Sequence, residues 1–210
     1  LLLFVPFWRF VQRRDNRSTP EQADVETTCM SSQGWFSVPE DRFFHRGHAW
    51  ARPESGDLVT VGLDEFAARL VGRAERLLLP PAGTKVGQGE PGWRLLCEDG
   101  TEIEMLSPID GTVAVVNPVA GSEPSVVLED PYGKGWLMKI RPARLRANCN
   151  NLLCGNVVRR WMEDAASAIC DQLSLDLGEL AQDGGAPVAG LARSINPDEW
   201  AAVVRKHLLT

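Results

Sequence analysis

The sequence predicts a mainly β domain with a helical C-terminal extension and a hydrophobic N-terminal segment. Between about residues 39 and 140, short runs of β-forming residues alternate with glycine and proline, a spacing typical of a sandwich or barrel. After about residue 145, apolar residues recur at helical spacing instead. The chain opens on the apolar run LLLFVPFWRF, and arginines follow it directly.

Residues 1–14 are predicted to be the end of a membrane anchor or a segment on a membrane surface. The apolar run is much shorter than the roughly 20 residues that span a bilayer. An aromatic side chain followed by arginines is typical of the cytoplasmic side, so we expect the cytoplasmic face of a membrane, in a bacterium the inner one. The residues expected next to the membrane are Phe7, Trp8, Arg9, Arg13 and Arg14. A processed or disordered N-terminus and a helix docked on a partner are the alternatives.

Residues 15–38 are polar and aperiodic and are predicted to be a linker to a domain over residues 39–145. Within that domain, DEFAARLVG predicts one helix, with Asp64 as its N-cap and Gly72 at its end. The runs predicted to be strands are DLVTVGL, ERLLLP, WRLLC, TVAVV, SVVLED and GWLMKI.

Residues 146–210 are predicted to be the helical extension. A four-residue repeat predicts the buried stripe Leu153, Val157, Trp161, Ala165, Ile169 and Leu173. A last helix is expected to begin with Asn196 as N-cap and Pro197 at its first position. Its apolar residues, which suit either the protein's own domain or a partner, are Trp200, Val203, Val204 and Leu208.

Charge and motifs exclude several classes of function. The net charge of −6 argues against nucleic acid as a partner, because phosphate binding needs a basic face. Five cysteines without a CxxC pair fit neither a disulfide scaffold nor a zinc site, and they suggest a reducing compartment. GQGEPG resembles a phosphate-binding loop but precedes a strand pattern, and His45 and His48 lack further metal ligands nearby. We therefore predict no catalytic residue, metal or small-molecule substrate, and no enzyme.

The β region resembles the glycine cleavage system H-protein family, the lipoyl carriers of that pathway. The resemblance covers about residues 39–142. Its segments in chain order are GHAWA, GDLVTVGLDEFAARLVG, LLLPPAGTKVGQGE, SPIDGTVAVVN and EDPYGKGWLMKIRP. The last is the most specific, because the family's Asp-Pro-Tyr-Gly-x-Gly-Trp motif is unbroken. The resemblance implies a barrel-sandwich hybrid, in which two short antiparallel sheets face each other and a hairpin displays the carrier lysine.

The hairpin departs from the family at that lysine. In the family the lipoylated lysine lies seven residues before the serine of Ser-Pro, which is Ser107 here, so Gly100 stands in its place. The Asp99-Gly100 pair predicts a type I′ turn, and alternation on the following strand predicts that Ile103 and Met105 are buried. From the missing lysine we expect no lipoate and a pseudo-carrier.

Together these features suggest a non-catalytic structural or adaptor subunit, tethered at a membrane and docked on a larger complex. Its expected partners are other protein subunits, for example of an energy-transducing respiratory or photosynthetic complex. The candidate contacts are Glu98, Asp99, Glu102, Glu104, Trp200 and Val204. The alternative is a decoy, regulatory or unusually modified member of the glycine cleavage or lipoate system.

Overall fold

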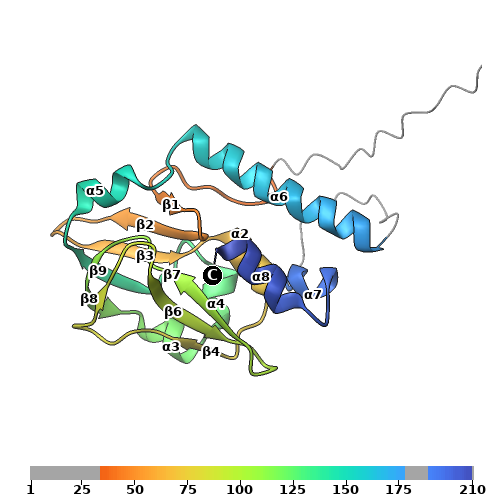
Figure 1. Cartoon of the computed structure of the whole chain (residues 1–210). Coiled ribbons are helices and arrows are strands. Elements are labelled where there is room, and N and C mark those ends of the chain that lie inside the picture. The colour runs from red at the N-terminus through yellow and green to blue at the C-terminus, as the bar shows by residue number, and fades with distance from the viewer. Residues whose placement is uncertain (1–33, 178–188, 210) are drawn as a thin grey trace, which may run out of the picture.

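The computed structural model describes residues 34–177 and 189–209, with side chains for 34–172 and 189–209 (Figure 1). In these parts of the chain no helix is both long and apolar enough to cross a membrane. The predicted membrane segment, residues 1–14, and most of the predicted linker lie outside the described residues.

Two antiparallel sheets form the body of the domain. The larger has the strand order β1-β2-β3-β9-β8-β5 and the smaller has the order β4-β6-β7. The strands of the larger sheet are β1 (Phe43–His45), β2 (Ala49–Pro53), β3 (Val59–Leu63), β9 (Met138–Pro142), β8 (Gly111–Val116) and β5 (Lys85–Val86). Those of the smaller sheet are β4 (Arg76–Leu78), β6 (Pro91–Leu96) and β7 (Glu102–Leu106). This arrangement confirms the predicted barrel-sandwich hybrid.

Helix α2 (Glu65–Val71) lies between β3 and β4 in the chain and has the ends that the sequence predicted. It begins after Asp64, whose Oδ1 accepts a hydrogen bond from Ala67 N at 2.9 Å. It ends at Gly72, which has a φ of 73°. Both the cap and the stop were predicted, because each depends on residues within the helix's own turns.

One predicted strand is a helix instead. SVVLE forms α4 (Ser125–Glu129), which follows α3 (Pro118–Ser122). Asn117 starts the helical segment, because its Oδ1 accepts from Val119 N at 3.0 Å and a proline follows it. An apolar run this short has no periodicity that separates a strand from a buried helix.

The buried stripe of the long helix α6 (Asn156–Leu177) is shifted from the predicted one over most of its length. Ile169 is buried as predicted, and the predicted Trp161 and Ala165 are partly buried against the core. Val157 is 60% exposed, and the side chain of Leu173 is not among those described. A strict four-residue repeat turns by about 40° at each step, so it cannot stay on one face. The buried side chains mix steps of three and four: Val158, Met162, Ala166, Ile169 and Cys170.

The C-terminal helices are part of the same core as the sheets. Two short helices, α7 (Leu191–Ile195) and α8 (Trp200–Leu208), lie beside α2 and α6 (Figure 1). α8 begins three residues later than predicted, because Asn196 Oδ1 accepts from Asp198 N and Glu199 N and caps the turn before it. The apolar residues of the last helix are all buried in the domain: Trp200, Val203, Val204 and Leu208. This burial agrees with packing on the protein's own domain.

The end of the predicted linker also belongs to the domain. Phe36 is buried, and its ring meets that of Phe66 edge-on at a centroid distance of 5.3 Å. Ser37 N donates to Glu65 Oε2 at 2.8 Å. The prediction of a linker up to residue 38 is therefore wrong for its last residues.

The chain's three histidines lie where the β1–β2 turn meets α2, α6 and α8. His48 Nδ1 is 2.8 Å from Asp64 Oδ2, and its ring stacks between Phe66 and Trp161 at 4.1 and 4.5 Å. Burial, then nearby Lys206 and His48, lowers the pKa of His207 to about 4. Burial, then His48, also lowers the pKa of His45.

Acidification is therefore expected to destabilise the fold. His45 and His207 have lower pKa values in the folded chain than in the unfolded chain, so the unfolded chain binds protons first as the pH falls. Their contribution to the free energy of unfolding is complete above the ordinary value of 6.5. It is lost as the pH falls below that value, and for His207 the loss continues down to about pH 4. Urea unfolding at a series of pH values measures this loss. His207→Gln, which stays uncharged, should reduce the slope, and an unchanged slope would contradict the assignment.

Candidate functional site

The candidate site is the tip of the β6–β7 hairpin, where the family carries its lysine. Cys97 N donates to Thr101 O and Gly100 N donates to Cys97 O, each at 2.9 Å, which leaves a three-residue loop over residues 98–100. Gly100 has a φ of +81°, whereas Asp99 does not have a positive φ. The predicted type I′ turn is therefore wrong, because that turn needs positive φ at both central residues.

The strand that follows the tip has the predicted alternation. Ile103 and Met105 are completely buried, while Glu102 and Glu104 are exposed. Glu102 pairs across the hairpin with Arg94 at 2.8 Å, and Glu98 at the tip pairs with Arg73 at 3.7 Å. Three of the acidic residues proposed as partner contacts, Glu98, Asp99 and Glu102, thus have basic neighbours within the chain.

Asp99 is held from three sides. Its Oδ1 accepts from Thr101 N at 3.0 Å within the loop. Its Oδ2 accepts from Trp200 Nε1 at 2.9 Å and from Arg193 Nη2 at 3.2 Å. These contacts outweigh the effect of partial burial and lower the pKa of Asp99, with the Thr101 N–H as the largest cause. Asp99 and the tip are therefore fixed to the C-terminal helices.

Helices α7 and α8 also contact each other, and α8 contacts the hairpin at a second point. The Arg193 guanidinium carbon lies 3.7 Å from the centre of the Trp200 ring, a cation–π contact. Arg205 Nη2 donates to the carbonyl oxygen of Glu102 at 3.3 Å. Trp200 and Val204, two of the proposed partner contacts, are buried within the domain. Whether any partner binds the acidic residues stays a prediction.

The tip does not provide an attachment point for a lipoyl group. Gly100 is exposed, and a Cβ built there would meet no atom within 4 Å, so the position is open. It has no amine, however, and an amide-linked group needs one. Cys97 is completely buried, and this burial raises the pKa of its thiol, which makes it a poor nucleophile.

The chain's lysines lie elsewhere. Lys85, Lys134 and Lys206 are exposed, and Lys139 pairs with Glu54 at 2.7 Å. Within the described residues no group of three or more His, Cys, Asp or Glu side chains is placed to hold a metal ion.

The loop over residues 130–136, which carries the Asp-Pro-Tyr-Gly-x-Gly-Trp motif, is closed by its aspartate. Asp130 Oδ2 accepts from Lys134 N at 2.8 Å, and Asp130 O accepts from Gly135 N at 2.9 Å. A Cβ on Gly135 would lie 2.6 Å from Asp130 O and 2.7 Å from Val126 O, and one on Gly133 would collide with the Asp130 carboxylate. At Gly135 only glycine fits without a shift of the backbone, and at Gly133 a side chain would displace the Asp130 carboxylate from its hydrogen bond with Lys134 N.

The same motif joins the N-terminal part of the domain to α2. The Tyr132 hydroxyl donates to Ser37 O at 2.8 Å and accepts from Glu65 N at 3.2 Å. Trp50 Nε1 donates to Pro131 O at 3.1 Å. The motif is thus a structural junction between β2, α2 and the loop.

A match to a family model identifies the family. The model of the glycine cleavage H-protein family matches residues 42–165. The chain belongs to the glycine cleavage H-protein family.

Individual relatives match the same region. The glycine cleavage system H protein of Magnetococcus marinus is 31% identical over 131 residues, which are 62% of this chain and 91% of that protein. The one from Rubrobacter xylanophilus is 38% identical over 104 residues, 50% of this chain and 81% of that protein. A crystal structure of an H protein from Mycobacterium marinum matches at 29% identity with a TM-score of 0.46, over 50% of this chain and 87% of that one.

Membership of this family corrects one expectation. The sequence predicted no lipoate, whereas members of the family are non-catalytic proteins that carry lipoate. Gly100 excludes an amide bond at that residue only, and exposed lysines remain at three other positions. The expectation that the whole chain takes no lipoate is therefore overturned.

Gly135→Ala is expected to destabilise the domain by about 1–3 kcal/mol or more, because its methyl group collides with two backbone carbonyls. Gly121→Ala is the matched control, since a Cβ there meets no atom within 4 Å. It lies in α3, so the control is expected to be neutral or to stabilise by up to about 1 kcal/mol. Urea unfolding of the two variants measures the difference, and equal stabilities would contradict this account of the loop.

Proposed function

We propose that this chain is a non-catalytic regulatory or unusually modified member of the glycine cleavage system. One observation carries the proposal. The family's domain is retained over residues 42–165 with its 130–136 loop closed, while the hairpin tip has glycine at the position of the carrier amine.

A domain of this kind can act through its surface alone. A carrier must dock on the enzymes that load and unload its arm, and docking depends on shape and charge around the hairpin. A chain that keeps this scaffold without an amine at the tip would occupy an enzyme's docking site and deliver nothing from the tip. An arm attached at one of the exposed lysines would leave from a different part of the surface. A chain without an arm and a chain with an arm at another lysine would both act within the glycine cleavage system. Locating any modification distinguishes these two possibilities.

The predicted attachment to the cytoplasmic face of a membrane stays a prediction. It depends on residues 1–14, which lie outside the described residues. Membership in a larger membrane complex, with other protein subunits as partners, also stays a prediction. The family match favours a role in the glycine cleavage system over membership in such a complex.

Binding to the enzymes of the system tests the proposal. Purified glycine decarboxylase and aminomethyltransferase are each titrated with the chain in a calorimeter, and an ordinary H protein serves as competitor. We expect binding to at least one enzyme, and we expect the ordinary H protein to displace the chain. The absence of binding to both enzymes would refute the proposal.

Gly100→Lys is expected to create a site for lipoate ligase at the tip. A lysine there has open space around it, although a left-handed residue with a side chain costs roughly 1–2 kcal/mol. Incubation with ligase and lipoate, followed by peptide mass spectrometry, locates any lipoyl group. The natural chain is the control, and a lipoyl group on one of its own lysines would identify the unusual modification. Failure to modify residue 100 would show that the ligase no longer recognises this hairpin.

A further inference from the structure

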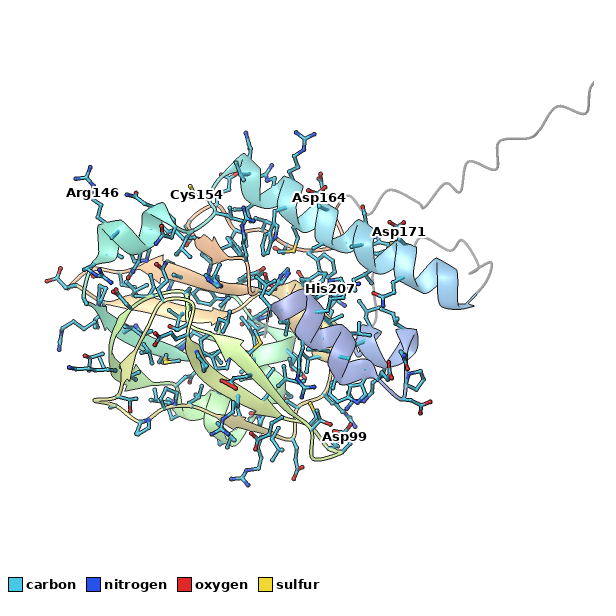
Figure 2. All side chains as sticks on the ribbon, in the orientation of Figure 1. Asp99, Arg146, Cys154, Asp164, Asp171 and His207 are labelled. Carbon is cyan, nitrogen blue, oxygen red and sulfur yellow. The ribbon has the colours of Figure 1, made fainter. Side chains whose placement is uncertain are left out.

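The contact between the tip and the C-terminal helices has an apolar part and a polar part. The apolar part is the face by which α7 and α8 pack into the core, and its buried residues are Leu191, Ala192, Ile195, Trp200, Val203, Val204 and Leu208. The polar part lies at the solvent edge, where the Asp99 and Arg193 side chains are 42% and 35% exposed. Figure 2 shows Asp99 at the far end of the hairpin, away from His207 on α8.

These two parts differ in how easily they open. Undocking α7 and α8 would expose many apolar side chains together, and each is costly to bring into water. The Asp99–Arg193 ion pair is partly exposed and contributes much less, and the hydrogen bond from Trp200 Nε1 to Asp99 contributes about as much as one buried apolar side chain. Local opening at Asp99 is therefore cheap compared with release of the helices. The tip can separate from Arg193 and Trp200 while the apolar part of α8 stays in place.

We propose that Arg193 and Trp200 form a latch on Asp99 that holds the hairpin tip against α7 and α8, so that the tip is open on the side of Gly100 and closed to an enzyme on the side of Asp99. The latch is intramolecular and joins residues about a hundred positions apart in the chain. An enzyme that surrounds the tip must first break it, because α8 and the Arg193 side chain lie against one side of the hairpin. The identity of such an enzyme, a lipoate ligase or a glycine cleavage enzyme, rests on the proposed function. The latch itself does not depend on that identity.

Trp200→Phe tests the latch with little change elsewhere. Phenylalanine keeps an aromatic ring in the buried site but lacks the N–H that donates to Asp99. Glu98→Gln is the matched control, because it removes the neighbouring acidic charge, whose basic neighbour Arg73 is 3.7 Å away at an exposed site. Hydrogen exchange of the amides of residues 97–101, followed by NMR or mass spectrometry, reports how often the tip opens.

The expected result is exchange on the order of tenfold faster at the tip in Trp200→Phe, as for the loss of a hydrogen bond to a charged acceptor. Exchange in α6 should be unchanged, and Glu98→Gln should exchange like the natural chain. Equal exchange at the tip in Trp200→Phe and in the natural chain would overturn the latch.

A second comparison tests access. Gly100→Lys and the double variant Gly100→Lys with Trp200→Phe are incubated with lipoate ligase, and the rate of modification at residue 100 is measured. The latch predicts a several-fold faster rate in the double variant, and equal non-zero rates would overturn its role in access. If neither variant is modified, the ligase does not recognise this hairpin, and the role of the latch in access for the ligase is refuted, while the proposed function is decided by binding to the glycine cleavage enzymes. The hydrogen-exchange comparison then decides the latch independently.

Discussion

The buried carboxylate of Asp64 is the contact on which the architecture depends. It caps α2 through Ala67 N and pairs with His48, so one completely buried side chain joins the helix to the β1–β2 turn. His48 in turn stacks against Trp161, which attaches the long helix α6 to the same point. A buried hydrogen bond to a carboxylate contributes about 1.5–3 kcal/mol, so the loss of either partner is costly. The sheets and the C-terminal helices therefore form one core.

The second constraint acts at the opposite end of α8. Asp99 accepts from its own loop and from two residues of the C-terminal helices, which fixes the hairpin tip. In a carrier the tip displays a reactive arm, and in this chain the same place is tied to the body of the protein. The family match shows the ancestry of the domain, and the amine-free, anchored tip is what suggests a regulatory or unusually modified form. The prediction of membrane attachment depends on residues 1–14, which are not part of this domain.

The sequence predicted what depends on neighbouring residues. Helix α2 was predicted because Asp64 and Gly72 mark its ends, and the burial of Ile103 and Met105 followed from alternation along one strand. The family's motifs predicted the fold and located Gly100. Features that depend on distant residues were missed. Which residues of α6 are buried depends on the elements that pack against the helix. The Asp99–Trp200 hydrogen bond joins residues 101 positions apart, so no local sequence pattern predicts it. Arg193 was not predicted as part of the site for the same reason.

A reconstituted glycine cleavage reaction tests the central claim most directly. The reaction is run with a limiting amount of an ordinary lipoylated H protein, and this chain, produced without lipoate, is added in increasing amounts. We expect the rate of glycine cleavage to fall to a plateau or to zero and to recover when more H protein is added, because this chain and the H protein would share docking sites on the enzymes. A rate that stays constant at every concentration of the chain would contradict this claim.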